Sequence, residues 1–450
     1  MRAARIMAIG AAAALAVGLV AAPMHVQARP ASSARTDGRA VGRAVDDDVH
    51  LNEVQVVGSH NSYHLIPSQA EVDLRRSFIG DADDALQYRH VALPEQFQSQ
   101  KVRQIELDVF LDPAGGKYAN PLLRLAAGTG PYDPAMNEPG IKVLHVQDVD
   151  YESTCLSLKA CLGEVETWSD ANPSHLPIAV LVELKDSEVP VAGFPFVVPD
   201  PWNAPAMDTL DAEIRSVMDP SDLITPDDVR GTRPTLEEAV LTDGWPTIGE
   251  SRGKVMFLMD NGGDYRTDYL AGHPTLEDRA VFTNGEPGSP DAAFVKRNDS
   301  DDPSIPTLVE QGYVVRTRAD GDTVEARSND TTKRDLAFAS GAQWVSTDYP
   351  VPGLAVGFTS GYFAEIPGGT VARCNPINGP ATCVDAELDT IFDPVAPPVT
   401  VPPTTVPPTT VPPDATTTTT GAPAPSGEAP GGVSPAPGAS PVAGRPAFTG

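Results

Sequence analysis

The segment Ile105-Glu106-Leu107-Asp108-Val109-Phe110 alternates two acidic residues with large apolar ones. This alternation predicts a β-strand with Glu106 and Asp108 on one side, because successive side chains of a strand point to opposite faces. In a barrel, that side faces the interior or the mouth. The two acids are therefore placed to bind a ligand or a metal ion at the end of a strand.

Similar apolar runs recur along the chain, with helix-compatible stretches between several of them. The runs are Val54–Val57, Ile105–Phe110, Val143–Val146, Ile178–Leu184, Val255–Met259, Tyr313–Thr317 and Trp344–Thr347. The helix-compatible stretches include Ala92–Lys101, Leu156–Asp170, Met207–Val217, Thr235–Val240 and Thr331–Ser340. Short buried strands that alternate with helices favour parallel βαβ units. We predict an α/β fold, a TIM-type (β/α)8 barrel whose eighth strand is hidden in a long connection; a doubly wound open sheet is the alternative.

The two ends of the chain are not expected to contribute to the hydrophobic core. Residues 1–28 combine Arg2 and Arg5 with an apolar stretch and the small residue Ala28, which predicts a signal peptide; an uncleaved anchor is the alternative. Residues 29–46 are predicted to be a disordered leader, and 394–450, a Thr/Pro-rich stretch, a disordered tail. The tail ends in Pro-Ala-Phe-Thr-Gly, which faintly resembles a wall-sorting signal. The globular domain is predicted over 47–393.

Charge and cysteine usage narrow the class of protein. The chain has 61 acidic and 32 basic residues, a formal net charge of −29. Such a surface repels nucleic acid, so we expect no nucleic-acid partner. The four cysteines form two close pairs in the sequence, Cys155/Cys161 and Cys374/Cys383. In an exported chain these predict local disulfides, and neither pair has the spacing of a zinc site.

Polar residues with catalytic or metal-binding chemistry lie at the ends of several predicted strands. They are His60 and Asn61, Glu106 and Asp108, His145, and Glu183 with Lys185. If the strands are parallel, their carboxyl ends share one rim of the barrel, and these side chains converge there. Oxygen atoms from Asn61, Glu106, Asp108 and Glu183 suit a hard cation, above all Ca²⁺.

Proton transfer is the expected role of His60 and His145, because imidazole titrates near neutral pH. Lys185 and Arg316 are candidates for binding a phosphate, with Arg318 a further one. Each element also has a structural interpretation. The His-Asn pair could cap a turn, and Glu106 and Asp108 could lie on a solvated face. His145 could be a core histidine with satisfied hydrogen bonds, and Glu183 could pair with Lys185. Asp348, after the run Trp344–Thr347, is expected either to orient a histidine or to cap a loop.

The remaining histidines have no comparable sequence context, and we expect them at the surface or in loops: His50, His64, His90, His175 and His273. Two long connections, Pro113–Gly140 and roughly Ser187–Gly231, are expected to shape the pocket. The second contains the apolar run Phe194–Trp202, expected to pack over the barrel mouth or to touch lipid or a sugar ring.

Taken together, these motifs resemble the secreted, Ca²⁺-dependent bacterial branch of the phosphatidylinositol-specific phospholipase C superfamily. The matching segments are Gly-Ser-His60-Asn61-Ser-Tyr, Glu106-Leu-Asp108-Val, Val-Leu-His145, Val-Glu183-Leu-Lys185, Val315-Arg316-Thr-Arg318-Ala-Asp320, Glu325-Ala-Arg327 and Gly341-Ala-Gln-Trp344-Val-Ser-Thr-Asp348-Tyr-Pro. The resemblance covers about Val54 to Pro350.

The resemblance implies the barrel of phospholipase C-like phosphodiesterases and cleavage of phosphatidylinositol through a cyclic inositol phosphate. It implies that Asn61, Glu106, Asp108 and Glu183 bind calcium. His60 and His145 match the acid–base pair, and Glu106 would help to activate the inositol hydroxyl. We expect an exported monomer that contacts a membrane surface transiently, with the tail as a link to the cell wall.

Two other functions stay open. Glycerophosphodiester phosphodiesterases share the barrel and a similar order of motifs, although they usually carry Arg-Gly where this chain has Asn61. A non-enzymatic surface protein with a structural Ca²⁺ ion is the alternative from a different class.

Overall fold

A ring of parallel strands forms the centre of the fold. The computed structural model describes residues 44–189, 195–389 and 391; the predicted signal peptide, most of the leader and the tail lie outside these residues. The strands of the ring are β1 (Val54–Ser59), β2 (Gln104–Phe110), β4 (Ile178–Leu184), β6 (Val255–Met259), β7 (Val281–Phe282), β8 (Phe294–Lys296), β9 (Val314–Arg318) and β10 (Trp344–Thr347).

Each strand of the ring pairs in parallel with the next one along the chain, and β10 pairs back with β1. Between β7 and β8 the link is a parallel bridge from Asn284 to Phe294. Because the ring is closed and its order follows the sequence, the fold is the predicted (β/α)8 barrel.

Three short strands lie beside the ring: β3 (Lys142–Val143), β5 (Leu223–Ile224) and β11 (Ala372–Cys374). The expectation for Val143–Val146 was wrong, since β3 is antiparallel to β2 and is not part of the ring. An apolar run of this length does not reveal strand direction. The preceding insertion returns the chain to the carboxyl end of β2, where β3 pairs with Val109 and Phe110. The two strands of the ring that the sequence did not reveal, β7 and β8, are too short to show a periodicity.

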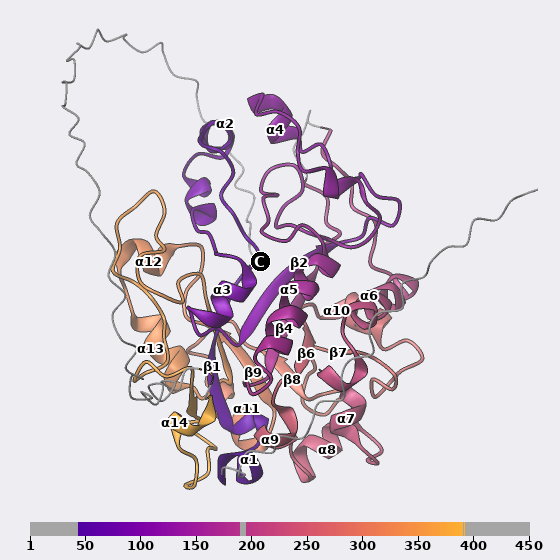
Figure 1. Cartoon of the computed structure of the whole chain (residues 1–450), viewed down its shortest axis with the longest axis vertical. Coiled ribbons are helices and arrows are strands. Elements are labelled where there is room, and N and C mark those ends of the chain that lie inside the picture. Colours follow the sequence, from indigo (N-terminus) through magenta and orange to yellow (C-terminus); the bar gives the residue numbers. More distant parts are fainter. Residues whose placement is uncertain (1–43, 190–194, 390, 392–450) are drawn as a thin grey trace, which may run out of the picture. The chain divides into compact units, whose positions relative to one another are not determined.

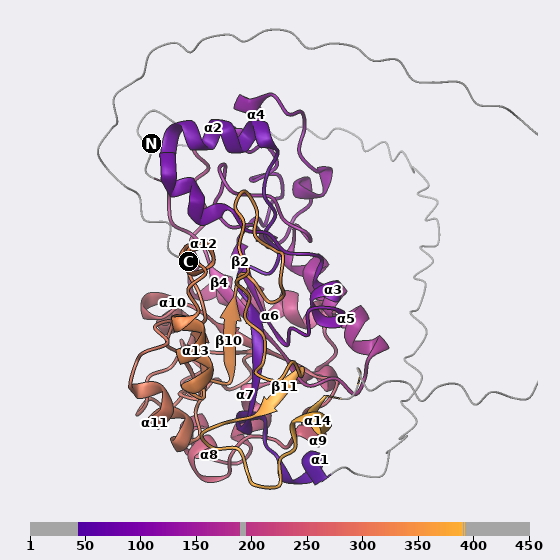
Figure 2. The same ribbon diagram turned by 90° about the vertical axis from the view of Figure 1, so that its left-hand side faces the viewer.

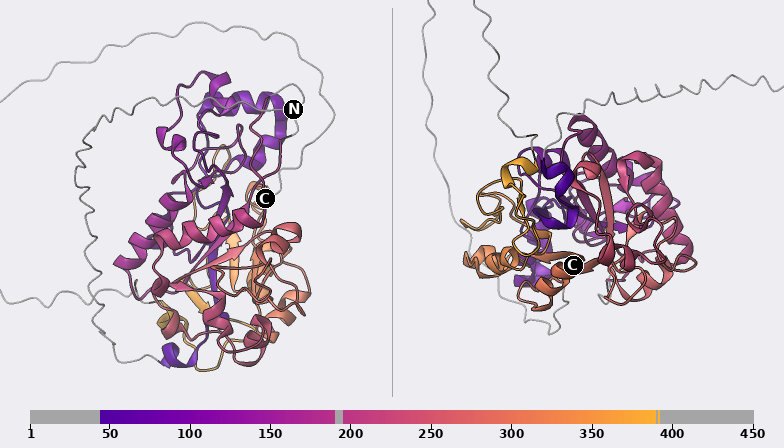
Figure 3. Two further views of the ribbon diagram at one scale, coloured as in Figure 1. Left: turned by 90° about the vertical axis from the view of Figure 1, so that its right-hand side faces the viewer. Right: turned by 90° about the horizontal axis from the view of Figure 1, so that it is seen from below.

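Helices surround the strands (Figure 3). The α-helices are α1 (Ala44–Asp48), α2 (Gln69–Ile79), α3 (Leu93–Gln98), α4 (Leu122–Ala127), α5 (Leu158–Ala171), α6 (Ala204–Val217), α7 (Pro226–Arg230), α8 (Leu236–Thr242), α9 (Ile248–Ser251), α10 (Gly263–Tyr269), α11 (Ser304–Gln311), α12 (Val324–Ser328), α13 (Thr332–Ala339) and α14 (Asp385–Leu388). The 3-10 helices are η1 (Leu51–Glu53), η2 (Gly80–Leu86), η3 (Pro134–Asn137) and η4 (Pro220–Asp222). No helix of the described residues is long and apolar enough to cross a membrane.

The strands are buried because their outward side chains pack under helices and their inward ones fill the barrel. All six residues of β1 and all seven of β2 are buried. Gly58 lets β1 approach β2 closely, since a Cβ at this position would lie 1.8 Å from Gln104 Oε1. A side chain at position 58 would therefore force the buried Gln104 side chain to move.

Two helices lie beyond the carboxyl ends of the strands, where α2 packs against α4 (Figures 1 and 2). Helix α2 begins at a capping box: Ser68 Oγ accepts from the Glu71 N–H, and the Glu71 carboxylate accepts from the Ser68 N–H. The helix α4 is part of the long connection Pro113–Gly140. This insertion therefore covers the end of the barrel at which the predicted site residues gather.

Candidate active site

The carboxyl end of the barrel brings together the residues that the sequence singled out. His60 and Asn61 follow β1, Glu106 and Asp108 lie in β2, Glu183 is in β4, and Arg316 and Arg318 lie in β9. Parallel pairing places Asp108 beside Glu183 in the sheet. Residues that are tens to hundreds of positions apart in the sequence thus become neighbours, because their strands are adjacent in the ring.

Asn61 has a side chain fixed by one contact. Its backbone is in the left-handed region, with φ 43°, a conformation that Asn adopts more readily than most residues. Its Nδ2 donates to the hydroxyl of Tyr88 at 2.8 Å. Its Oδ1 is buried and has no hydrogen-bond partner among the described residues. The amide is therefore held with its oxygen free to bind a cation.

Three carboxylates form a buried cluster. One oxygen each of Glu106, Asp108 and Glu183 lies within 4.8 Å of the others. Burial raises the pKa of Asp108 well above its ordinary value, and burial raises the pKa of Glu106 to about 7 against the opposing effect of Arg316. Both shifts show that the charged forms are costly here without additional positive charge.

Two cationic side chains contact this cluster. Lys185 Nζ lies 2.6 Å from Glu183 Oε1 and 3.2 Å from Asp108 Oδ2. Arg316 contacts the Glu106 carboxylate with Nη2. The prediction that Lys185 and Arg316 bind a phosphate stays a prediction, because in this structure both cations pair with carboxylates of the cluster.

The donor set fits a calcium ion. All the candidate ligand atoms are oxygens, and Asp108 Oδ1, Glu183 Oε2 and Asn61 Oδ1 are buried without a hydrogen-bond partner among the described residues. Buried polar atoms normally have partners, and a cation would supply one to these carboxylate and amide oxygens. Ca²⁺ accepts carboxylate and amide oxygens, which are the types present.

His60 is oriented by a carboxylate. Its Nδ1 lies 2.8 Å from Asp348 Oδ1 and 3.2 Å from Arg318 Nη2. Its Nε2 has no hydrogen-bond partner among the described residues and lies 3.9 Å from Glu106 Oε1. Burial, together with Arg318, lowers the pKa of His60 well below its ordinary value. A neutral ring that donates from Nδ1 to Asp348 leaves Nε2 able to accept a proton, so the expectation that Asp348 orients a histidine is confirmed.

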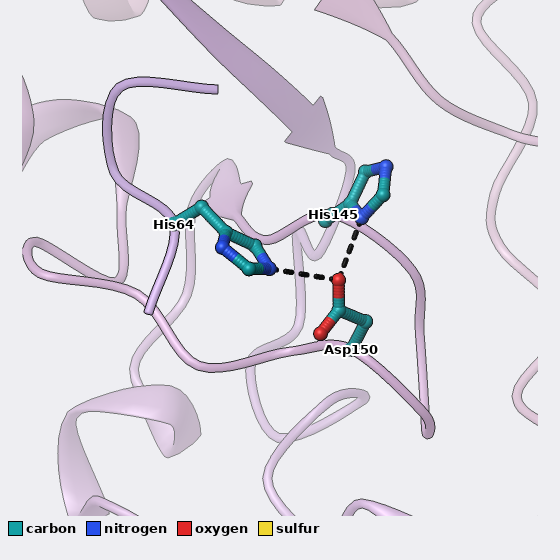
Figure 4. A group of neighbouring side chains, drawn as sticks. All are labelled: His64, His145 and Asp150. Atoms are coloured by element: carbon teal, nitrogen blue, oxygen red, sulfur yellow. Dashed lines mark hydrogen bonds and ion pairs between the residues drawn. The ribbon is translucent and has the colours of Figure 1, made fainter. Parts of the chain in front are cut away.

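His145 is oriented in a similar way, although it follows β3 rather than a strand of the ring. Its Nδ1 lies 2.7 Å from Asp150 Oδ2 (Figure 4). Burial lowers the pKa of His145, and Asp150 opposes this shift. His60 and His145 line one pocket, together with Ala85, Leu86, Tyr88, Asp322 and Asp348. A bound substrate could therefore contact both imidazoles at once.

Several residues at the site were not expected from the sequence. His64 is fully buried, with Nε2 2.8 Å from the same oxygen of Asp150 that His145 contacts (Figure 4). His64, His90 and His175 lie outside the helices and strands, as expected for loop residues, but all three are buried rather than at the surface. His64 directly follows the segment Gly-Ser-His60-Asn61-Ser-Tyr, but its partner Asp150 belongs to a turn 86 residues further along the chain.

Both cysteine pairs form disulfides, and the apolar run of the second long connection ends in a buried residue. Cys155 bonds to Cys161 and Cys374 to Cys383, which confirms both predicted disulfides. In the run Phe194–Trp202, Phe194 lies outside the described residues, while Trp202 is buried and its backbone N–H donates to Asp186 Oδ2 at 3.0 Å.

Comparison with known proteins gives a family for this arrangement. The chain matches the family model described as "Phosphoinositide phospholipase C, Ca2+-dependent" over residues 49–376. No curated protein sequence matches the chain. Among solved structures, it is similar to the calcium-dependent phosphoinositol-specific phospholipase C of the Gram-negative bacterium Pseudomonas sp. in its myoinositol complex. The identity is 15%, the TM-score is 0.47, and the match covers 74% of this chain and 97% of the other.

A second similar structure is the Ca²⁺-dependent phosphatidylinositol-specific phospholipase C of Streptomyces antibioticus, at 18% identity and a TM-score of 0.41, with 67% of this chain and 95% of the other covered. The family model, which spans most of the chain, carries the assignment. The chain belongs to the family of calcium-dependent phosphoinositide phospholipases C, which are phosphodiesterases.

Proposed function

We propose that the protein is an exported, calcium-dependent phosphodiesterase that cleaves phosphatidylinositol into diacylglycerol and a cyclic inositol phosphate. The observation that carries this proposal is the position of two histidines, each oriented by a carboxylate, in one pocket beside a cluster of oxygen ligands.

Asn61, Glu106, Asp108 and Glu183 would hold the calcium ion. When bound, the ion would stabilise the negative charge that develops on the oxygens of the phosphodiester. The carboxylate cluster supports this role, because three acids in close proximity repel one another unless positive charge is added.

His60 and His145 would transfer the protons. The inositol hydroxyl next to the phosphate attacks phosphorus and gives its proton to one imidazole. The bond from phosphorus to the glycerol oxygen breaks, and that oxygen takes a proton from the other imidazole. Each ring has Nδ1 bound to a carboxylate, which directs Nε2 toward the reacting atoms. Such a pair contributes on the order of 10² to 10⁴ in rate for each group.

The position of exposed apolar side chains supports contact with a lipid surface. Four of them, each more than half exposed, lie on the side of the barrel that carries the pocket. Phe78 and Leu125 are on α2 and α4, and Val324 is two residues after the pocket residue Asp322. Val198 follows Val197, whose N–H donates to Asp148 in the turn after His145. Leu241, Leu336 and Val384 are exposed elsewhere. An apolar rim around the mouth would insert into a bilayer while the head group enters the pocket.

Export is supported by the signal-like sequence of residues 1–28 and by the two disulfides. The Thr/Pro-rich segment 394–450 would extend the folded domain from the cell wall. Both segments lie outside the described residues.

The test is an assay of the purified protein on phosphatidylinositol and on glycerophosphoinositol, each with calcium and with a chelator. Release of cyclic inositol phosphate from phosphatidylinositol with calcium, and loss of this activity with chelator, is the expected result. Turnover of glycerophosphoinositol alone would instead identify a glycerophosphodiester phosphodiesterase. Tight calcium binding without turnover of either substrate would refute both and leave a calcium-binding surface protein.

A further inference from the structure

A tight turn carries the carboxylate that orients His145. Val146 and Asp150 form an antiparallel bridge across this turn, with hydrogen bonds of 2.8 and 2.9 Å between their backbones. The Asp150 side chain is fully buried, and three side chains contact its carboxylate. His145 and His64 both contact Oδ2, and Arg75 Nη1 donates to Oδ1 at 2.6 Å. One oxygen of Asp150 is thus shared by two imidazoles.

His64 is itself held rigidly. Its ring stacks on the ring of Tyr88, with centroids 4.3 Å apart and planes at 20°. Its Nδ1 lies 3.0 Å from the carbonyl oxygen of Tyr88, so oxygen acceptors face both ring nitrogens. An antiparallel bridge from His64 to Ser153 also joins its backbone to the segment that follows Asp150. The ring therefore has little freedom to leave the carboxylate.

A metal ion is not the best occupant of this group, although His64, His145 and Asp150 have metal-binding chemistry. The atoms of these residues that could bind a metal ion already contact one another at hydrogen-bond distance, and the guanidinium of Arg75 contacts the same carboxylate. A divalent cation would repel that guanidinium at close range. The hydrogen-bonded network explains the distances without an ion.

We propose that His64 is a positioning residue for His145, which acts by holding Asp150 Oδ2 in the direction of His145 Nδ1. This proposal rests on the proposed function. With Arg75 on one oxygen and His64 on the other, the carboxylate cannot rotate away from His145. The Nδ1–H of His145 then stays bound to Asp150, and its Nε2 stays directed into the pocket that it shares with His60.

Removal of the His64 donor should reduce turnover without weakening substrate binding. We expect His64→Phe, which keeps a ring but has no donor, to lower kcat by about ten-fold or more. The loss should stay below that of His145→Ala, on the order of 10² to 10⁴. KM should be unchanged, because His64 does not line the pocket. His64→Gln, whose amide can donate to Asp150, should recover most of kcat.

A double-mutant cycle separates positioning from general destabilisation. If His64 acts through His145, then His64→Phe should cause no further loss in the His145→Ala background. If the kcat of the double variant falls by the product of the two single-variant losses, the proposal is overturned. The matched control is His175→Gln, which alters a buried histidine before β4, at the opposite end of the strands. The control should keep wild-type kcat; a loss equal to that of His64→Phe would show that any buried histidine has the same effect.

A second readout does not need activity. In the full-length protein with ¹⁵N-labelled histidines, the ring nitrogen shifts of His145 report which nitrogen carries the proton, and the spectrum of His145→Ala assigns them. We expect a proton on Nδ1 in the wild type and a mixture of tautomers in His64→Phe, with His64→Gln close to wild type. An unchanged His145 spectrum in His64→Phe would refute the proposal. If the wild type turns over no phosphodiester, the proposed function fails, while these spectra still decide the role of His64.

Discussion

Lys185 gives the sharpest test of how the oxygen cluster binds a cation. Its ammonium contacts two carboxylates of the cluster, Asp108 at 3.2 Å and Glu183 at 2.6 Å, and its side chain is 20% exposed. Burial alone would lower the pKa of Lys185, but Asp108 and Glu183 raise it above its ordinary value. The ammonium thus supplies positive charge at the place where calcium would supply it.

The competition can be estimated from the distances. At an effective dielectric constant of about 20, each of these contacts has a gross Coulomb attraction of roughly 5 to 6 kcal/mol. Most of this is offset by loss of hydration, and breaking a buried ion pair costs about 3–5 kcal/mol. If calcium binding breaks ammonium contacts that stabilise the calcium-free site by even about 1.4 kcal/mol, the affinity for calcium is about ten-fold lower than it would be without them.

We therefore predict that Lys185→Met binds calcium about ten-fold or more tightly than the wild type. The same variant should be less stable in chelator, because Asp108 and Glu183 lose the cation that they contact. Titration calorimetry with calcium and urea unfolding in chelator measure the two effects. The control is Lys117→Met, which removes a lysine paired with Asp200 outside the cluster and makes the same change in net charge. Equal or weaker calcium binding by Lys185→Met, relative to this control, would refute the reasoning.

Four further predictions follow from the site and its surroundings. Asp348→Asn should lower kcat on the order of 10² or more, because the amide no longer fixes the His60 ring, and steady-state kinetics on phosphatidylinositol measure it. Arg75→Met should lower the free energy of unfolding by about 3–5 kcal/mol in urea, since it removes the guanidinium that pairs with two buried carboxylates, Asp83 and Asp150. Burial by itself raises the pKa of Asp150, but His64 and Arg75 hold this pKa well below its ordinary value. The stabilisation by its charged form is therefore complete above the unfolded pKa of about 3.9 and is lost as the pH falls through the folded pKa, so Asp150→Asn should be more costly in urea at pH 7 than at pH 3. Leu125→Ser should weaken sedimentation with phosphatidylinositol vesicles and leave turnover of a short-chain soluble substrate unchanged.

Matched variants make these predictions decisive. Arg233→Met removes an exposed ion pair with Asp243 and should leave the unfolding midpoint unchanged. Val384→Ser alters an apolar residue that is exposed away from the barrel mouth and should leave vesicle binding unchanged. A loss of vesicle binding equal to that of Leu125→Ser would contradict the proposed rim. A cost of Asp150→Asn that is the same at both pH values would contradict the low pKa.

Much of the fold could be predicted from local patterns. Six of the strands in the ring are long enough to show continuous burial or alternation, and the runs at Ile105–Phe110 and Ile178–Leu184 correspond to β2 and β4. β7 and β8, of two and three residues, are too short for any periodicity to appear. The direction of β3 was also hidden, because a short apolar run packs equally well in a parallel or an antiparallel pair.

The sequence by itself determined the kinds of chemistry that this protein can perform. Side-chain type and strand periodicity are local properties, so the oxygen ligands, the two histidines at strand ends and the neighbouring cysteines could be identified from residues close together in the chain. The tertiary structure decided which groups support them. Lys185, a candidate for binding a phosphate, lies against Asp108 and Glu183, and Asp150 joins His64 to His145. Such contacts depend on the path of loops between distant segments, and no pattern within one segment encodes that path.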